Sequence, residues 1–188
     1  MLRWRDLDRP LVVTLLLLLL TGLIVVYSAC QGEQGDLHLD YWQKQIVFAI
    51  VGVVVAGLVA GVPPSVWERS APVLYIVSIA ALALVLVAGD SAGGARRWIA
   101  IGGLRFQPSE LAKLATVLLV ARWLANRKRP PSSLAELVSP VVLVLVPFGL
   151  TLKEPDLGTA LVFLAALPPM LYWSGVSLPY LLLAEALR

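Results

Sequence analysis

Long runs of apolar residues dominate the hydrophobic pattern of this chain, and short polar segments separate the runs. The runs are continuous rather than alternating, which excludes a membrane β-barrel. A hydrocarbon core of about 30 Å is crossed by about 20 mostly apolar helical residues. The pattern therefore predicts an all-α fold, a polytopic transmembrane helix bundle. We predict six complete spans, at residues 11–29, 46–62, 71–88, 108–125, 137–152 and 157–173.

The composition agrees with a membrane protein. Of the 188 residues, 59% are hydrophobic and only 14% are charged, whereas a soluble domain has roughly 45 to 50% apolar residues. The sequence shows no Walker motif, dinucleotide fingerprint, zinc pattern or Ser-His-Asp arrangement. We therefore expect no nucleic-acid partner and no metal site of a known pattern.

Basic residues predict the orientation, because cytoplasmic loops of membrane proteins are enriched in Lys and Arg. Basic residues gather before the first span, after the second and after the fourth, at Arg3, Arg5, Arg9, Arg69, Arg122, Arg127, Lys128 and Arg129. The amino terminus is therefore predicted to be cytoplasmic. The run RKRPP, residues 127–131, is most simply a topology signal, although it could also contact a cytoplasmic partner or anionic lipid.

The two ends of the chain each raise an alternative. The basic start, the first apolar run and YSAC ending at Cys30 imitate a lipoprotein signal, but the run is long enough to span. After Trp173, the stretch YLLLAEALR starts a seventh apolar helix that would reach only half-way across the bilayer. We therefore expect residues 1–188 to form one transmembrane domain, the amino-terminal part of a longer protein.

The most unusual polar segment is GGARRWIAIGGLRFQPSELAK, residues 93–113. Arg96, Arg97 and Arg105 lie on the predicted outer side, where basic residues are not expected, and guanidinium groups bind phosphate in a bidentate fork. The glycines allow tight turns and close approach of a ligand. We expect this segment to lie in the membrane interface and to bind a phosphate group; the alternative is that its arginines only reach lipid headgroups.

The fourth span carries an ion pair. Pro108 suits the first helical position, and Glu110 and Lys113 are three residues apart, so they share one face of the helix. Lys113 should lie below the membrane surface, where ionisable residues are candidates for function. The alternative is an ion pair that only stabilises the helix.

A second polar group, KEPD at residues 153–156, separates the fifth and sixth spans. Asp156 fits the N-cap of the sixth span. A cap needs only one acid, so Glu154 is also a candidate for binding substrate or its counter-cation. The two acids could hold Mg²⁺ or Mn²⁺, but an acid pair alone is weak evidence for a metal.

These two motifs together resemble one family. GARRWIAIGGLRFQPSELAK followed by KEPDLGTA is similar to the SEDS proteins of bacterial cell-wall synthesis, the RodA, FtsW and SpoVE group, and within it more to RodA. The resemblance implies a ten-span protein of the bacterial cytoplasmic membrane that polymerises lipid II into glycan strands for cell elongation. Its implied partners are a class B penicillin-binding transpeptidase and other membrane proteins of the elongation or division complexes.

The resemblance also implies roles for the candidate residues. Arg96, Arg97 and Arg105 would hold the lipid diphosphate, Lys113 would reach it, and Glu110 would orient Lys113, which are electrostatic roles in glycan transfer. The acid favoured as catalytic in the family lies beyond Arg188, so no catalytic residue is predicted here, and this chain alone is not expected to be active.

Two other functions stay open from the sequence. Glu110 and Lys113 could line a route by which a transporter moves a lipid-linked sugar across the bilayer. The chain could also be a scaffold that recruits cell-wall enzymes without catalysing a reaction.

Overall fold

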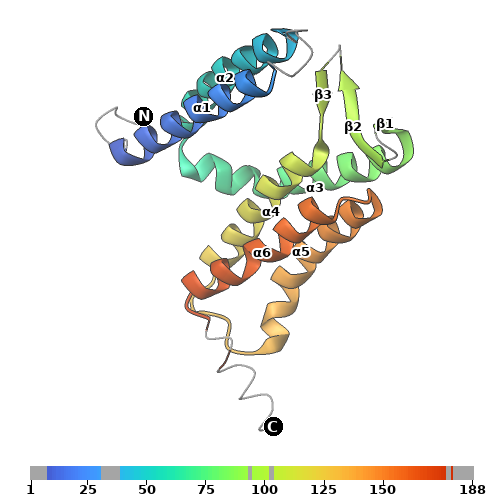
Figure 1. The fold of residues 1–188 in the computed structure, drawn as a ribbon. Coiled ribbons are helices and arrows are strands. Elements are labelled where there is room, and N and C mark those ends of the chain that lie inside the picture. Colours follow the sequence, from blue (N-terminus) through green and yellow to red (C-terminus); the bar gives the residue numbers. More distant parts are fainter. Residues whose placement is uncertain (1–7, 31–38, 93–94, 102–103, 177–178, 180–188) are drawn as a thin grey trace. The chain divides into compact units, whose positions relative to one another are not determined.

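The computed structural model describes residues 8–30, 39–92, 95–101, 104–176 and 179 (Figure 1). The chain forms two compact units, residues 1–66 and 67–188, which are described separately. The predicted start of a seventh helix, residues 180–188, lies outside the described residues.

The first unit contains two long apolar helices, α1 (Arg9–Ala29) and α2 (Leu39–Ala60). Asp8 caps α1 by accepting a hydrogen bond from the Leu11 amide at 3.3 Å, and the rings of Tyr27 and Trp42 lie 5.2 Å apart. None of the residues in α1 is buried. Helices that expose apolar side chains all around are typical of membrane spans.

The second unit contains most of α3 (Pro64–Ala88) and all of α4 (Pro108–Ala125), α5 (Leu134–Lys153) and α6 (Leu157–Trp173). Figure 1 shows α5 and α6 side by side, joined by a short turn. One apolar cluster joins all four helices, and its buried members are Leu82, Ala112, Val120, Val144 and Phe163. The predicted bounds of α4 and α6 are confirmed, while α3 and α5 begin earlier than predicted.

Prolines inside two helices are matched by side chains of neighbouring helices. A proline has no N–H, so the carbonyl four residues before it loses its helical donor. Pro147 in α5 frees the Leu143 carbonyl in this way, and the Tyr75 hydroxyl of α3 donates to it at 3.0 Å. Pro72 in α3 likewise frees the Glu68 carbonyl, which accepts from Arg122 of α4 at 2.7 Å. These two hydrogen bonds connect α3 to α5 and to α4 and fix its position along their axes.

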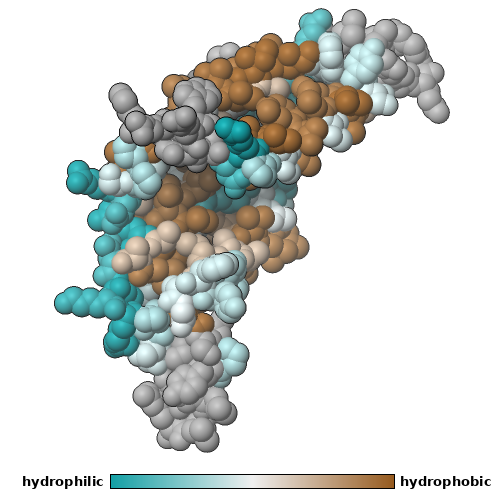
Figure 2. Space-filling model, turned by 90° about the vertical axis from the view of Figure 1, so that its left-hand side faces the viewer, coloured by the Kyte–Doolittle hydropathy of each residue, from teal (hydrophilic) through white to brown (hydrophobic). Residues whose placement is uncertain are grey.

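The described part of the chain contains four helices long and apolar enough to cross a membrane: α1, α2, α3 and α5. Large apolar side chains cover much of the surface of the described residues (Figure 2). The prediction of a multi-pass, helical membrane protein is therefore confirmed. The count of six spans is not, because α6 has only 17 residues and α4 contains Glu110, Lys113 and Arg122.

Residues 90–106 form a small sheet, which the sequence analysis did not predict. Strands β1 (Asp90–Ala92), β2 (Ala95–Ile101) and β3 (Leu104–Phe106) pair antiparallel in the order β1-β2-β3. We expected a loop in the membrane interface, because apolar residues of this segment are interleaved with its charges. The signal for strands was present: Ile99 and Ile101 alternate with other residues, and Gly102-Gly103 is a typical hairpin dipeptide.

Candidate functional site

The turn between α5 and α6 is held by one arginine of the sheet. Arg97 of β2 donates from Nε to the Glu154 carbonyl at 3.0 Å and from Nη2 to the Pro155 carbonyl. Its Nη1 lies 3.8 Å from Oδ2 of Asp156. One guanidinium thus contacts three consecutive residues of the turn. We call the end of the unit formed by residues 90–92, 95–101, 104–113 and 153–157 the sheet end.

Asp156 is the centre of the hydrogen bonds at the sheet end. As the N-cap of α6 it accepts from the Thr159 amide at 3.1 Å and from the Thr159 hydroxyl at 2.9 Å. Burial on its own would raise the pKa of Asp156, but the two bonds from Thr159, the Arg97 charge and the Gln107 amide together lower this pKa below its ordinary value. Asp156 is therefore ionised at neutral pH, and its predicted role as a cap is confirmed.

Gln107 connects the site to α4, and the sequence analysis did not single it out. It is the N-cap residue of α4, but its side chain makes no capping bond. Instead Nε2 donates to Oδ2 of Asp156 at 3.3 Å. The sequence did carry one signal: glutamine is not a favoured N-cap residue. Its presence before Pro108 therefore indicates a contact other than capping.

Glu154 has the most unusual environment in the described structure. Its side chain is 1% exposed, and neither carboxylate oxygen has a hydrogen-bond partner among the described residues. Burial, together with the neighbouring charge of Asp156 and against that of Arg97, raises the pKa of Glu154 to about 7. The Glu154 carboxyl therefore exchanges a proton near neutral pH. The hydroxyls of Ser109 and Thr151 are also buried without a partner in the described part of the chain.

Glu110 and Lys113 form the predicted ion pair, with Nζ of Lys113 at 2.9 Å from Oε1 of Glu110. The Glu110 side chain is more than half exposed, and that of Lys113 is about one quarter exposed. The buried residues of α4 nearby are Ser109, Ala112 and Thr116. The pair therefore lies on a face of α4 that α5, α6 and the other described residues of the second unit leave open.

The three arginines of the loop do not all meet at one point. Arg105 pairs with Ala100 across the hairpin, and successive residues of a strand point to opposite faces. Arg97 and Arg105 consequently lie on opposite faces, and Arg105 is exposed. Arg96 pairs with Ser91 in the sheet, while its side chain lies outside the described residues. Of the two loop arginines whose side chains the structure describes, Arg97 contacts residues 154–156 of the second motif.

The two acids of that motif do not fit a divalent cation. The carboxylate oxygens of Asp156 already accept hydrogen bonds from Thr159 and Gln107. The carboxyl of Glu154 is enclosed, and burial raises its pKa to about 7. No group of three potential metal ligands is found among the described residues. No step of the function proposed below runs through Mg²⁺ or Mn²⁺, and the predicted cation stays a prediction.

Comparison with known proteins identifies the family. Residues 9–187 match the model of the FtsW, RodA and SpoVE cell cycle proteins. The chain belongs to this family. The match covers both motifs, so the contacts of Arg97, Gln107 and Asp156 join segments that lie within the family region.

Two curated relatives carry the names of enzymes. The chain is 37% identical over 171 residues to the peptidoglycan glycosyltransferase MrdB of Escherichia coli, covering 91% of this chain and 45% of the relative. It is 35% identical over 182 residues to the probable peptidoglycan glycosyltransferase FtsW of Halorhodospira halophila, covering 93% and 46%. The chain spans about half the length of the curated relatives that it matches.

Solved structures agree with this assignment. The rod shape determining protein RodA of Thermus thermophilus superimposes with a TM-score of 0.80 at 34% identity, covering 96% of this chain and 58% of that one. A chain in a peptidoglycan synthase complex that coordinates polymerization and crosslinking matches with a TM-score of 0.75 at 35% identity, covering 86% and 46%. The described fold is therefore that of the FtsW, RodA and SpoVE family.

Proposed function

We propose that the protein containing this chain is a peptidoglycan glycosyltransferase that polymerises lipid II, and that this chain supplies part of its substrate site. The observation that carries the proposal is the joining of the two family motifs by Arg97 and Gln107, which fix the turn at Asp156 against the start of α4. The names of its relatives supply the reaction class. The site of this chain gives that reaction a cationic surface next to a rigid turn.

The sheet end suits a diphosphate because it presents cations on a fixed frame. Lys113 follows Gln107 by six residues, which places it about 9 Å along the helix, on the open face of α4. Its ammonium can donate to a phosphate oxygen while Glu110 keeps it oriented through the 2.9 Å bond. A positive charge held beside the departing diphosphate lowers the barrier to glycan transfer, because charge develops there in the transition state.

Arg97 has a different role in this proposal from the one expected from the sequence. Two of its three nitrogens donate to backbone carbonyls of the α5–α6 turn, so it positions the site and retains only part of its donor capacity for a phosphate. Arg105 is exposed and is available to a diphosphate at the membrane surface; a role of Arg96 in binding the diphosphate stays a prediction from the sequence.

We also infer six spans and a cytoplasmic amino terminus. Helices α4 and α6 share the buried cluster of Ala112, Val120 and Phe163 with α3 and α5, and helices packed along membrane spans have the same lipid environment. Their 18 and 17 residues measure about 26 Å, close to the hydrocarbon thickness. The basic residues at 122 and 127–129 then face the cytoplasm of a bacterial cell, and the sheet end faces outward.

The partners proposed are lipid II and a class B penicillin-binding transpeptidase, in keeping with the complex that coordinates polymerization and crosslinking. The test uses purified full-length protein in sealed vesicles with lipid II supplied on the outward face. Glycan strands that resist boiling in detergent support the proposal. Movement of labelled lipid II across the vesicle membrane without polymer would contradict the proposal. The absence of both polymerisation and transport, in protein that is folded and bound to its transpeptidase, would contradict it as well.

A further inference from the structure

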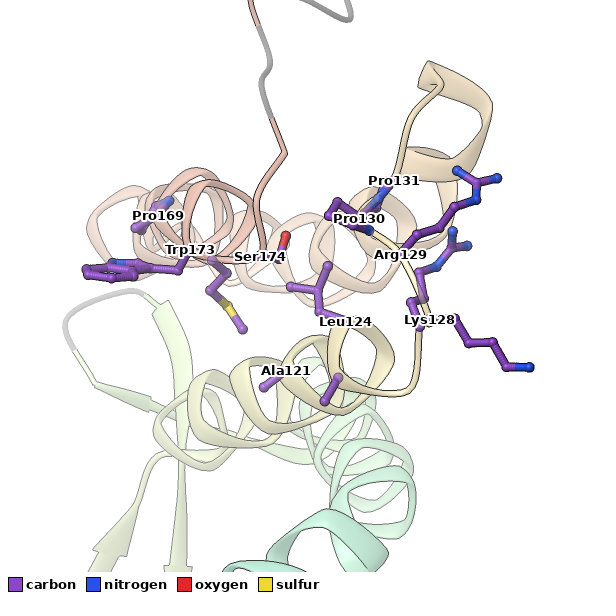
Figure 3. Close-up of a pocket in the computed structure, with 12 residues that line it drawn as sticks. Ala121, Leu124, Lys128, Arg129, Pro130, Pro131, Pro169, Trp173 and Ser174 are labelled. Atoms are coloured by element: carbon purple, nitrogen blue, oxygen red, sulfur yellow. The ribbon is translucent and has the colours of Figure 1, made fainter.

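The second unit has a pocket at the end opposite the sheet end. The proposed reaction does not use this pocket. It has a volume of about 540 Å³ and lies between the last turns of α4 and α6 and the loop that follows α4. In Figure 3, Lys128 and Arg129 lie on one side of this pocket, and Pro169 and Trp173 on the other. The pocket therefore has a cationic side, whose charged ends extend outward and away from Trp173, and an apolar side.

The cationic side carries more positive charge than its own acid can balance. Arg127 and Arg129 both contact Glu136, at 3.4 and 2.9 Å. Lys128 is exposed and has no acidic partner among the residues that the structure describes. Three cations thus face one carboxylate. The carboxyl ends of α4 and α6 add about half a negative charge each, and the amino end of α5 adds about half a positive charge, so an excess of positive charge remains.

The loop that carries these cations is held in place before any ligand binds. The Arg127 guanidinium stacks on the Trp123 ring at 4.0 Å, and Glu136 accepts a hydrogen bond from the Ser132 amide at 2.9 Å. A Cβ added to Gly175 would lie only 3.2 Å from the ring of Pro130, so the loop packs closely against the end of α6. A site with this little freedom loses little entropy on binding.

The apolar side points to a lipid as the occupant. Leu124 and Met170 line the pocket, and Trp173 is 84% exposed at the end of a helix in a membrane protein. Tryptophan at such a position lies at the level of the lipid headgroups. A soluble anion would use the cations and leave this apolar wall exposed to water, whereas a lipid uses both.

We propose that this pocket binds an anionic glycerophospholipid of the membrane leaflet that surrounds it. Its phosphate lies against Lys128 and Arg129, and one acyl chain follows Leu124, Met170 and Trp173. Basic pockets between membrane helices bind anionic lipid headgroups in this way. The inference rests on the pocket alone and holds whether or not the protein polymerises lipid II.

The test measures lipid bound to the full-length protein. Protein purified from nanodiscs of phosphatidylglycerol or of phosphatidylcholine is analysed by native mass spectrometry, as wild type and as Lys128→Gln with Arg129→Gln. Wild type should retain phosphatidylglycerol in preference to phosphatidylcholine. In the double variant the ratio of bound phosphatidylglycerol to bound phosphatidylcholine should fall about tenfold. The matched control, Arg9→Gln with Arg69→Gln, removes two positive charges that lie outside the pocket on the same predicted cytoplasmic side. This control should keep the preference for phosphatidylglycerol.

Three results would overturn the proposal. Equal retention of both lipids by wild type would remove the anionic site. Complete displacement of phosphatidylglycerol by glycerol 3-phosphate at low millimolar concentration would show that the pocket selects a soluble phosphate. Failure of a photoactivatable acyl chain to crosslink near Met170 and Trp173 in the full-length protein would show that another part of the protein fills the pocket.

Discussion

The guanidinium of Arg97 lies 3.8 Å from the carboxylate of Asp156 and donates to the two carbonyls that precede it. These contacts connect the strand of the first family motif to the turn of the second. The residues are far apart in sequence, so their meeting fixes how the sheet sits on the ends of α5 and α6. The first two predictions follow from this connection.

Replacement of Arg97 should destabilise the protein, and lysine should not rescue it. Arg97→Ala removes the donors to the carbonyls of residues 154 and 155; residue 154 is buried and residue 155 is exposed, so the loss comes mainly from the carbonyl of residue 154 and costs about 1 to 3 kcal/mol. Arg97→Lys restores the charge but not the planar fork, so it should recover less than half of the loss. Thermal unfolding in detergent measures both. The control, Arg105→Gln, lies on the exposed face and should unfold as wild type; equal stability of all three variants would contradict the role of Arg97.

Glu154 should make stability fall as the pH rises toward and through about 7. Its pKa is about 7 in the folded state and about 4.5 in an unfolded chain, so the folded state holds a proton that the unfolded state has lost. The stabilisation is complete below pH 4.5 and is lost as the pH rises through 7. Glu154→Gln mimics the protonated form and should flatten this part of the curve. The unfolding temperature between pH 5 and 8.5 is the measurement, and an unchanged slope in the variant would refute the assignment.

Tyr75 should matter only while Pro147 is present. Tyr75→Phe removes the hydroxyl that donates to the Leu143 carbonyl. Pro147 has no N–H to replace this donor, so the change should cost about 1 kcal/mol of unfolding free energy. In a Pro147→Ala background the helix can supply its own N–H to that carbonyl, so the same change should cost much less. A double-mutant cycle of unfolding free energies measures this difference. Additive effects would show that the hydroxyl and the proline are independent.

Gly175 should not tolerate a side chain. It follows α6 with φ of +86°, and the bonds from Gly175 to Tyr172 and from Val176 to Leu171, each 3.0 Å, complete a Schellman motif. Gly175→Ala strains this conformation and presses on Pro130, so it should cost about 1 kcal/mol or more. Gly149→Ala is the control inside α5, where a Cβ meets nothing within 4 Å, and it should stabilise slightly. Equal effects of the two changes on the unfolding temperature would contradict this account.

The helices could be predicted from the sequence because membrane spans depend on local composition. The bounds of α4 and α6 follow from Pro108 and Asp156, each of which marks a helix start by its own chemistry. The Glu110 and Lys113 pair was also predictable, since it needs only helical spacing. The sheet was missed because the glycines and arginines that mark a ligand loop also occur in a hairpin.

The contacts of the site could not be predicted from the sequence. Nothing local indicates that Arg97 donates to carbonyls more than fifty residues away, or that Gln107 bonds to Asp156. The same holds for the burial of Glu154, which no pattern near residue 154 indicates. Tertiary packing decides these features, and single-residue patterns carry no record of it.

The central claim, that Lys113 with Glu110 serves the diphosphate of lipid II, is tested most directly by reversing the pair in the full-length protein. Glu110→Lys with Lys113→Glu keeps the net charge and the ion pair but moves the ammonium by three residues, about 4.5 Å along the helix. Polymerisation of lipid II by the purified variant is compared with wild type and with Lys44→Gln, an exposed control in α2 of the first unit. We predict a folded protein with at least a hundredfold loss of polymerisation, against near-normal activity of the control. Near-normal polymerisation by the reversed pair would show that Glu110 and Lys113 only stabilise α4.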